Sequence, residues 1–191
     1  MSFSVLFVCT GNICRSPLAE RLLRSRLDES LPITVASAGT MGLVGYGIDA
    51  PSALALRELG VDPDGHEARR VDGALVGAAD LVLTAESAHR STVVQSDPLS
   101  FRRVFTMREF ARLGAALPKL DEPVTEDDLR GRVLLVADQR GQLDPPAPGE
   151  DEIGDPFGGS PAVARATAAE ISATVDGIRR ALGLLDPAIA S

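Results

Sequence analysis

The sequence has 191 residues, of which 45% are hydrophobic and 24% charged, and this composition suits one domain with a full core while excluding a disulfide scaffold, a coiled coil and a disordered chain. The chain has no apolar run of the ~18 residues that a membrane-spanning helix needs, and its start lacks the basic region of a signal peptide, so we expect a soluble, cytoplasmic protein without a membrane partner. Its formal net charge of −8, with no basic stripe, argues against nucleic acid as a partner.

The first part of the chain alternates between strand and helix patterns. Residues 3–9 form a nearly continuous apolar run, which is typical of a strand buried on both faces of a parallel sheet. A helix is predicted from Ser16 to about Asp28, because a proline and an acidic residue suit its first turn and leucines recur at helical spacing, at Leu18, Leu22, Leu23 and Leu27. The same patterns predict further strands and helices, with strands over 33–38, 79–84 and 103–106 and helices over 51–59, 86–95 and 108–113. This order predicts an α/β fold with a mostly parallel sheet.

Residues 114–152 interrupt the alternation. The segment is punctuated by prolines, and residues 121–155 contain eleven acidic against three basic residues, which accounts for the whole net charge. A helix capped near Thr125 is predicted to run to about Ala137, and a stiff proline-rich linker follows it. We interpret the segment as a solvated, acidic insertion in a single domain that spans residues 1–191, and a position beside the functional site stays open.

The last predicted helix, over 161–182, is long and amphipathic. Its apolar stripe is expected to face the core, at Val163, Ala166, Ile171, Val175, Ile178 and Leu182. His89, on the third predicted helix, is expected at the surface without a role. Cys9 and Cys14 match no zinc spacing and lie far from His66 and His89 in the sequence, so no metal or other cofactor is expected.

The segment Cys9-Thr10-Gly11-Asn12-Ile13-Cys14-Arg15-Ser16 is the sharpest functional signal. A strand ends at Cys9 and a helix begins near Ser16, so backbone N–H groups and the helix N-terminus converge on one point between them. Arg15 adds a planar fork that matches two phosphate oxygens. Such a cradle holds a dianion and also stabilises a thiolate at Cys9, which can attack a phosphoryl group in line. The alternative interpretation is a buried and inert cysteine at the end of a strand.

The run from Val8 to Glu20, which reads Val-Cys-Thr-Gly-Asn-Ile-Cys-Arg-Ser-Pro-Leu-Ala-Glu, resembles the signature of the low-molecular-weight protein tyrosine phosphatases. Shorter stretches of resemblance follow at 37–40, 66–69, 80–83 and 155–159. The resemblance implies a three-layer α/β sandwich in which helices flank a four-stranded parallel sheet. It also implies two-step hydrolysis of phosphotyrosine in protein substrates through a cysteinyl-phosphate intermediate.

The resemblance further implies how this loop would work. Cys9 is the expected nucleophile, and Arg15 is expected to bind the phosphate and stabilise the transition state. The other expected phosphate-binding positions belong to the same loop: Thr10, Gly11, Asn12, Ile13, Cys14 and Ser16. Ser16 would hydrogen-bond the Cys9 sulfur, and Asn12 would brace the loop with two residues behind it, Ser37 and His66.

Cys14 has two interpretations. It can pack as a small apolar residue behind the cradle, or it can trap oxidised Cys9 as a disulfide and shield the nucleophile from irreversible oxidation. The resemblance favours the second interpretation, which makes Cys9 and Cys14 a candidate redox pair.

Cleavage of an aryl phosphate also needs a proton on the departing oxygen, which contributes about 10²–10⁴ in rate. Of the five Asp-Pro pairs in the chain, only the one at Asp155 is followed by an aromatic residue and Gly-Gly-Ser before a long helix. In the family that the chain resembles the acid lies at this position, so Asp155 is the expected general acid and then general base. The neighbouring Asp151 and Glu152 are expected to be solvated charges.

Two aromatic residues are candidates for the substrate pocket. Tyr46 lies in the glycine-rich loop that forms a pocket wall in the family, and it can either stack on a phosphotyrosine ring or pack within its own loop. Phe157 stands where many relatives have a tyrosine.

Three other functions stay open. Arsenate reductases use a similar cradle, but a disulfide relay needs cysteines after Cys14 and none exists, which leaves only a reductase that uses an external thiol. A protein-arginine phosphatase is the second alternative, although relatives with that specificity tend to carry Thr where this chain has Ile13. A non-catalytic phosphate-binding or redox-sensing module is the third.

Overall fold

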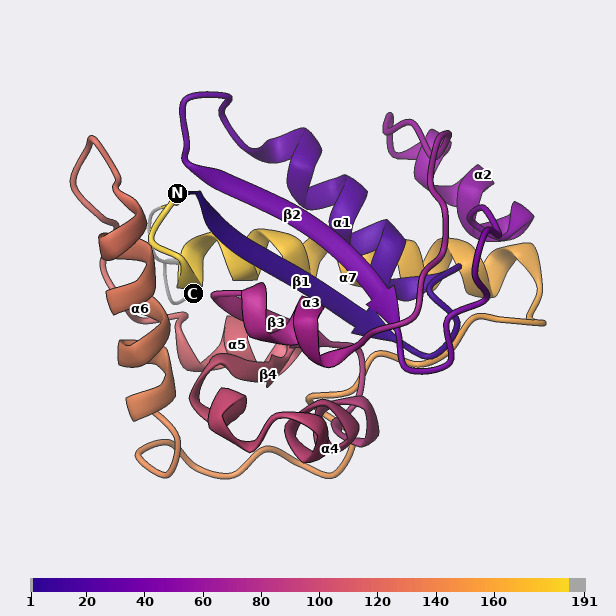
Figure 1. Ribbon diagram of the computed structural model, residues 1–191. Coiled ribbons are helices and arrows are strands. Elements are labelled where there is room, and N and C mark those ends of the chain that lie inside the picture. The colour runs from indigo at the N-terminus through magenta and orange to yellow at the C-terminus, as the bar shows by residue number, and fades with distance from the viewer. Residues whose placement is uncertain (1, 186–191) are drawn as a thin grey trace.

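The computed structural model describes residues 2–185 and has three layers, with helices on both faces of one parallel sheet (Figure 1). The strand order is β2-β1-β3-β4, with β1 at Phe3–Cys9, β2 at Ile33–Gly39, β3 at Leu81–Thr84 and β4 at Val104–Thr106. The helices are α1 at Arg15–Arg26, α2 at Ala50–Glu58, α3 at Gly73–Ala78, α4 at Ser87–Ser96, the 3₁₀ helix η1 at Pro98–Arg103, α5 at Met107–Leu113, α6 at Glu126–Asp138 and α7 at Pro161–Ala181. The expected α/β sandwich with a four-stranded parallel sheet is confirmed.

The central strand β1 is buried on both faces because its successive side chains point into opposite layers. Phe7 belongs to the larger core cluster, which also contains residues of α1, α5, α6 and α7. Leu6 and Val8 join a smaller cluster on the other face, with Val76 of α3 and Val93 of α4. Burial on both sides explains why the strand reads as a continuous apolar run in the sequence.

The predicted strands and helices agree with the structure to within about two residues at their ends, but α3 and η1 were missed. Both are only six residues long, about two turns, so neither repeats an apolar spacing often enough to be recognised in the sequence. The sequence signal for α3 was a cap, because the Asp72 side chain accepts a hydrogen bond of 2.8 Å from the Leu75 N–H.

The predicted apolar stripe of α7 is correct in its second half and wrong in its first. The later members are buried as expected, at Ile171, Val175, Ile178 and Leu182. Val163 and Ala166 are exposed, because the buried face runs from Ile171 three residues back to Ala168 and then four further back to Ala164, both small residues. The core face of the helix therefore begins with alanines, which the search for large apolar residues passed over.

The acidic segment is not a solvated excursion, and that expectation was wrong. The helix α6 buries one apolar face in the larger core cluster, at Leu129, Val133, Val136 and Ala137. Arg132, on the same helix, is also buried and donates a hydrogen bond to the carbonyl of Pro118. The acidic side chains of the first turn, such as Asp127, lie on the solvent side. The helix itself was predicted, but the dense negative charge around it concealed its apolar face.

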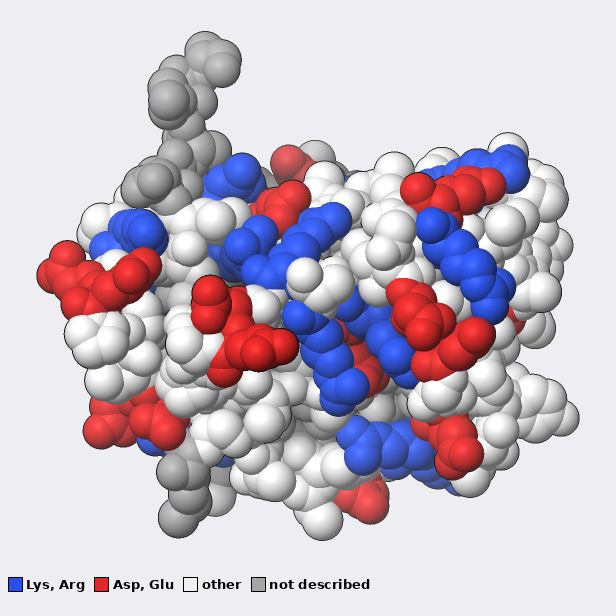
Figure 2. All heavy atoms as spheres, turned by 90° about the horizontal axis from the view of Figure 1, so that it is seen from above, with Lys and Arg blue, Asp and Glu red and all other residues white. Residues whose placement is uncertain are grey.

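Charges of both signs alternate on the surface. Figure 2 shows acidic and basic side chains next to one another on the face seen from above. Ion pairs such as Arg165 with Glu58 and Arg57 with Asp64, each at 2.7 Å, neutralise single bases locally. Within residues 2–185, no helix is long and apolar enough to span a bilayer.

Candidate active site

The loop between β1 and α1 lies at the carboxyl ends of the strands, where open parallel sheets bind their ligands. Segment 141–160, orange in Figure 1, runs past the same end of the sheet. A pocket of about 320 Å³ opens here, lined by Cys9, Thr10, Gly11, Ile13, Cys14, Arg15, Met41, Leu43, Asp155 and Phe157. The structure thus brings the loop and the candidate acid together around one hollow.

Asn12 holds the shape of the loop. It is fully buried and has a φ of 57°, a left-handed conformation that is uncommon for residues other than glycine. Its side-chain nitrogen donates to Ser16 Oγ at 2.9 Å and to Ser37 Oγ at 2.8 Å, and its side-chain oxygen accepts from the Arg69 N–H at 2.9 Å. Its carbonyl oxygen accepts from His66 Nε2 at 2.7 Å. The structure therefore places Ser37 and His66 behind the loop, where the sequence predicts them.

Cys9, the last residue of β1, has its sulfur 3.0 Å from Ser16 Oγ. The Ser16 oxygen already accepts a hydrogen bond from Asn12, so its own proton is available to the sulfur or to the Ala38 carbonyl at 3.3 Å. A hydroxyl proton directed at the sulfur stabilises a thiolate, and the N-terminus of α1 adds partial positive charge beside it. Both features are of the kind that favours a thiolate at such a position.

Arg15 is 1% exposed, and its guanidinium is held by contacts from several segments. Its Nη1 donates to the Ile153 carbonyl at 2.9 Å and forms an ion pair with Glu86. Its Nη2 lies 3.0 Å from Asp155 Oδ2 and 3.5 Å from Thr10 Oγ1. A cation this deeply buried keeps its position only because carboxylates and a carbonyl compensate its charge.

Asp155 stands half-exposed at the pocket edge, with its carboxylate paired to the buried guanidinium. The residues before it are not the solvated charges that the sequence predicts. Asp151 accepts a hydrogen bond of 2.7 Å from Arg112 of α5, and Glu152 accepts one of 3.0 Å from the Ser87 N–H at the start of α4. These contacts fasten the chain just upstream of Asp155 to two helices.

The pocket walls differ from the prediction at one of two positions. Phe157 lines the pocket, as expected. Tyr46 does not line it and is 65% exposed, because it ends a tight turn in which its N–H donates to the Leu43 carbonyl at 3.0 Å. Met41 and Leu43 form the wall instead, so the pocket side is aliphatic where an aromatic ring was expected.

His89 was wrongly expected at the surface. It is 6% exposed, and its Nε2 lies 2.8 Å from Thr10 Oγ1 in the loop. Its Nδ1 lies 4.0 Å from Glu86 Oε2, and burial lowers the pKa of the imidazole. The available signal was position, because His89 falls in the first turn after β3, the strand that pairs with β1.

Cys14 and Cys9 are both free and buried. The Cys14 thiol donates to Asp49 Oδ1 at 2.9 Å, and burial followed by this hydrogen bond raises the pKa of Cys14 well above its usual value. Asp49 was not singled out from the sequence, since nothing local links it to the loop.

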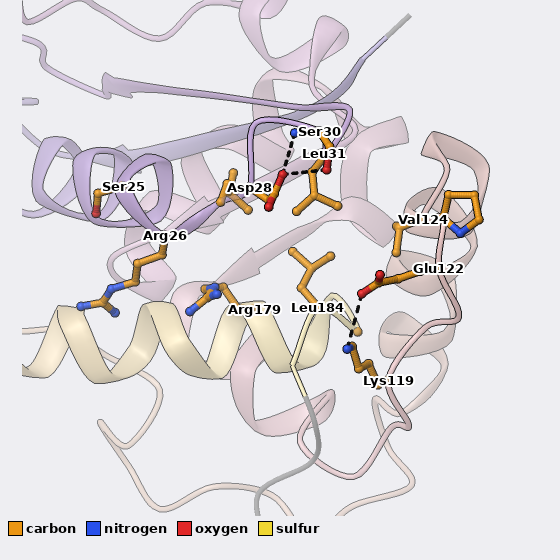
Figure 3. Close-up of a pocket in the computed structure, with 13 residues that line it drawn as sticks. Ser25, Arg26, Asp28, Ser30, Leu31, Lys119, Glu122, Val124, Arg179 and Leu184 are labelled. Carbon is orange, nitrogen blue, oxygen red and sulfur yellow. Dashed lines mark hydrogen bonds and ion pairs between the residues drawn. The ribbon is translucent and has the colours of Figure 1, made fainter.

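A second, larger hollow of about 840 Å³ lies at the opposite end of the sheet (Figure 3). Leu31 and Leu184 face each other across it, and Arg26 and Arg179 lie along one side. Both arginines contact Asp176, at 3.1 and 3.3 Å, so their charge is compensated. None of the site residues expected from the sequence lines this hollow, whereas the pocket at Cys9 gathers several of them.

Comparisons with known proteins agree with this geometry. A family model described as low molecular weight phosphotyrosine protein phosphatase matches residues 4–136. A probable low molecular weight protein-tyrosine-phosphatase, EpsP of Ralstonia nicotianae, is 37% identical over 116 residues, which are 60% of this chain and 77% of EpsP. The solved low molecular weight protein tyrosine phosphatase from T. tengcongensis has a TM-score of 0.69 and 27% identity, covering 93% of this chain and 97% of its own. The YwlE arginine phosphatase from Geobacillus stearothermophilus has a TM-score of 0.67 and 26% identity, covering 92% and 90%.

Proposed function

The chain belongs to the low molecular weight phosphotyrosine protein phosphatase family, and from this membership we propose that it hydrolyses phosphotyrosine in proteins with Cys9 as nucleophile, Arg15 as phosphate ligand and Asp155 as general acid and base. One observation carries the assignment of these roles. The Cys9 sulfur, the buried Arg15 guanidinium and the Asp155 carboxylate border the same pocket of about 320 Å³. We place the activity in the cytoplasm and in a single domain, without a cofactor.

In the first step the phosphate dianion binds the N–H groups of residues 10–16 and the fork of Arg15. The Cys9 thiolate attacks phosphorus, forming an S–P bond as the bond between phosphorus and the tyrosine oxygen breaks. The departing electron pair stays on that oxygen, which takes a proton from Asp155.

In the second step water attacks the cysteinyl-phosphate. Asp155, now a carboxylate, takes a proton from the water, and the S–P bond breaks to release phosphate and the Cys9 thiolate. The hydrogen bond available from Ser16 Oγ, at 3.0 Å, stabilises the thiolate as attacking group and as leaving group.

The ion pair between Asp155 and Arg15 belongs to the free enzyme in this scheme. Phosphate oxygens supply new acceptors to Arg15 Nη2, and the Asp155 carboxylate, once released, takes up a proton from solvent and turns towards the leaving oxygen. Substrate binding thereby prepares the acid.

The aliphatic wall of Met41 and Leu43, with Phe157 at the edge, supports an aryl substrate because it offers apolar contact to a flat ring. The likeness to an arginine phosphatase makes phosphoarginine the main alternative substrate, and a phosphoguanidinium is polar where an aryl ring is not.

Cys9 and Cys14 would also form a protective disulfide. Peroxide oxidises the Cys9 thiolate to a sulfenic acid, and the Cys14 sulfur displaces its oxygen as water.

A substrate panel tests the function. Matched peptides carrying phosphotyrosine, phosphoarginine or phosphoserine are compared by phosphate release, alongside arsenate reduction with a small external thiol. We expect turnover of phosphotyrosine to dominate. Faster release from phosphoarginine, or turnover of arsenate alone, contradicts the proposal.

The variant Cys9→Ser tests the nucleophile in the same assays. It should lose phosphotyrosine turnover while still binding inorganic phosphate by calorimetry, because the cradle stays intact. Phosphate binding without turnover in the wild-type protein would favour a non-catalytic binding module.

A further inference from the structure

Four side chains form a ring beside the phosphate-binding site, two of them from the loop itself and two from the start of α4. Arg15 Nη1 pairs with Glu86, and the other carboxylate oxygen of Glu86 lies 4.0 Å from His89 Nδ1. His89 Nε2 lies 2.8 Å from Thr10 Oγ1, which in turn lies 3.5 Å from Arg15 Nη2. We propose that His89 is a positioning residue that orients the Arg15 guanidinium from two sides, through Thr10 and through Glu86, an inference that rests on the phosphatase activity proposed above.

The donors and acceptors in the ring determine where the imidazole proton lies. A guanidinium only donates, so Thr10 Oγ1 accepts from Arg15 and directs its own proton to His89 Nε2. The proton of the neutral ring is then on Nδ1, which faces a carboxylate that only accepts. Nδ1 is buried and has no hydrogen-bond partner within residues 2–185. The gap of 4.0 Å to Glu86 is therefore the open link of the ring in the free protein.

A bound phosphate would close this link. When Arg15 Nη2 binds the phosphate oxygens, Glu86 keeps its pair with Nη1 while its other oxygen approaches Nδ1, and hydrogen bonds that are long in free enzymes often shorten in this way. The ring then holds the arginine when charge develops in the transition state, which is where an electrostatic contact contributes most to rate.

The surroundings of His89 keep the ring neutral. Four charged groups act on the imidazole. They are Glu86 at the start of the same helix, Arg15 of α1, and Glu152 and Asp155 of segment 141–160. Burial outweighs the carboxylates and lowers the pKa of His89. A protonated imidazole would donate to Thr10 Oγ1 and draw Glu86 away, so both supports of Arg15 would weaken together. Loss of rate on acidification should therefore accompany protonation of this residue.

Variants of His89 test the role. His89→Leu removes both links, and we expect kcat for an aryl phosphate to fall about tenfold, with a matching loss of affinity for vanadate as a transition-state analogue. His89→Gln keeps an amide that can face Thr10 and should recover to within about threefold of the wild type. The control is Val93→Ala, a buried residue one turn further along α4, which lowers thermal stability without touching the ring.

NMR of the imidazole nitrogens gives a readout that a purely structural residue would not move. At neutral pH we expect the imidazole proton of His89 on Nδ1. The pH at which His89 titrates should coincide with the pH at which kcat falls on acidification. In His89→Gln this fall in kcat should move to another pH. A proton on Nε2, wild-type kinetics in His89→Leu, or an equal kinetic loss in Val93→Ala each overturns the proposal. If the wild type hydrolyses no aryl phosphate, the proposed function fails. The position of the imidazole proton and the effect of His89→Leu on the affinity for inorganic phosphate then still test whether His89 orients Arg15.

Discussion

The carbonyl oxygen of Ile153 accepts a hydrogen bond of 2.9 Å from Arg15 Nη1, although 138 positions separate the two residues in the chain. Ile153 is fully buried, and its N–H donates to the Ala85 carbonyl at 2.9 Å. The end of the acidic segment is thus part of the structure that holds the phosphate ligand in place.

The ion pair between Arg112 and Asp151 should matter for catalysis because it fastens this segment beside Ile153. We expect Arg112→Ala to lower kcat/KM a few-fold in a steady-state assay. The control is Arg165→Ala, which removes a similar pair with Glu58 at 2.7 Å on the exposed surface, where an ion pair contributes about 0–1 kcal/mol. Equal kinetic effects of the two variants would show that the ion pair between Arg112 and Asp151 does not support catalysis.

Asp155→Asn should slow the enzyme most on substrates with poor leaving groups. An amide cannot supply a proton, so the expected loss is about 10²–10⁴ for phenyl phosphates of high leaving-group pKa and much less for nitrophenyl phosphates. The measurement is kcat across a series of substituted phenyl phosphates. A uniform loss along the series would point to another acid.

The left-handed backbone at Asn12 predicts an order among variants. Both Asn12→Gly and Asn12→Ala lose the hydrogen bonds to Ser16, Ser37 and Arg69, but only glycine accepts a φ of 57° without strain. Asn12→Ala should therefore be less stable than Asn12→Gly by about 1–2 kcal/mol in urea unfolding. A reversed order would mean that the loop adopts another backbone conformation.

The hydrogen bond from Cys14 to Asp49 predicts a slow thiol. Burial and Asp49 raise the pKa of Cys14, so the folded state binds this proton more tightly than the unfolded state does. The associated stability is complete below the ordinary thiol pKa of about 8.5 and is lost as the pH rises above it. In Asp49→Asn, alkylation of Cys14 by iodoacetamide should be faster and the alkaline loss of stability smaller.

Tandem mass spectrometry separates alkylation at Cys14 from that at Cys9, and the urea-unfolded protein gives the reference rate. The same variant should form the Cys9–Cys14 disulfide faster in peroxide, since the attacking group is a thiolate. An unchanged rate at Cys14 would show that burial alone restrains it.

The parts of the site that could be predicted from the sequence are those that are contiguous in it. The loop from Cys9 to Ser16 carries its own strand end, anion cradle and helix start, so local physics identifies it. Glu86 and His89 could not be placed this way, because the start of α4 meets the loop between β1 and α1 only in the folded protein.

The fold shows the same division. Runs of large apolar residues identified β1 and the second half of α7, where burial depends on side-chain volume. The buried alanines at the start of α7 were not predicted, because small residues give a weak amphipathic pattern. The apolar face of α6 was not predicted, because many acidic residues lie next to it in the sequence.

Asn12 shows why this loop could not be transplanted as a short peptide. Its conformation depends on Ser37, 25 positions downstream, and on Arg69, 57 positions downstream. A copy of the eight loop residues in a foreign scaffold would adopt another conformation and bind the anion less well. A working transplant would need the loop together with the stretches around Ser37 and Arg69, in the same relative positions.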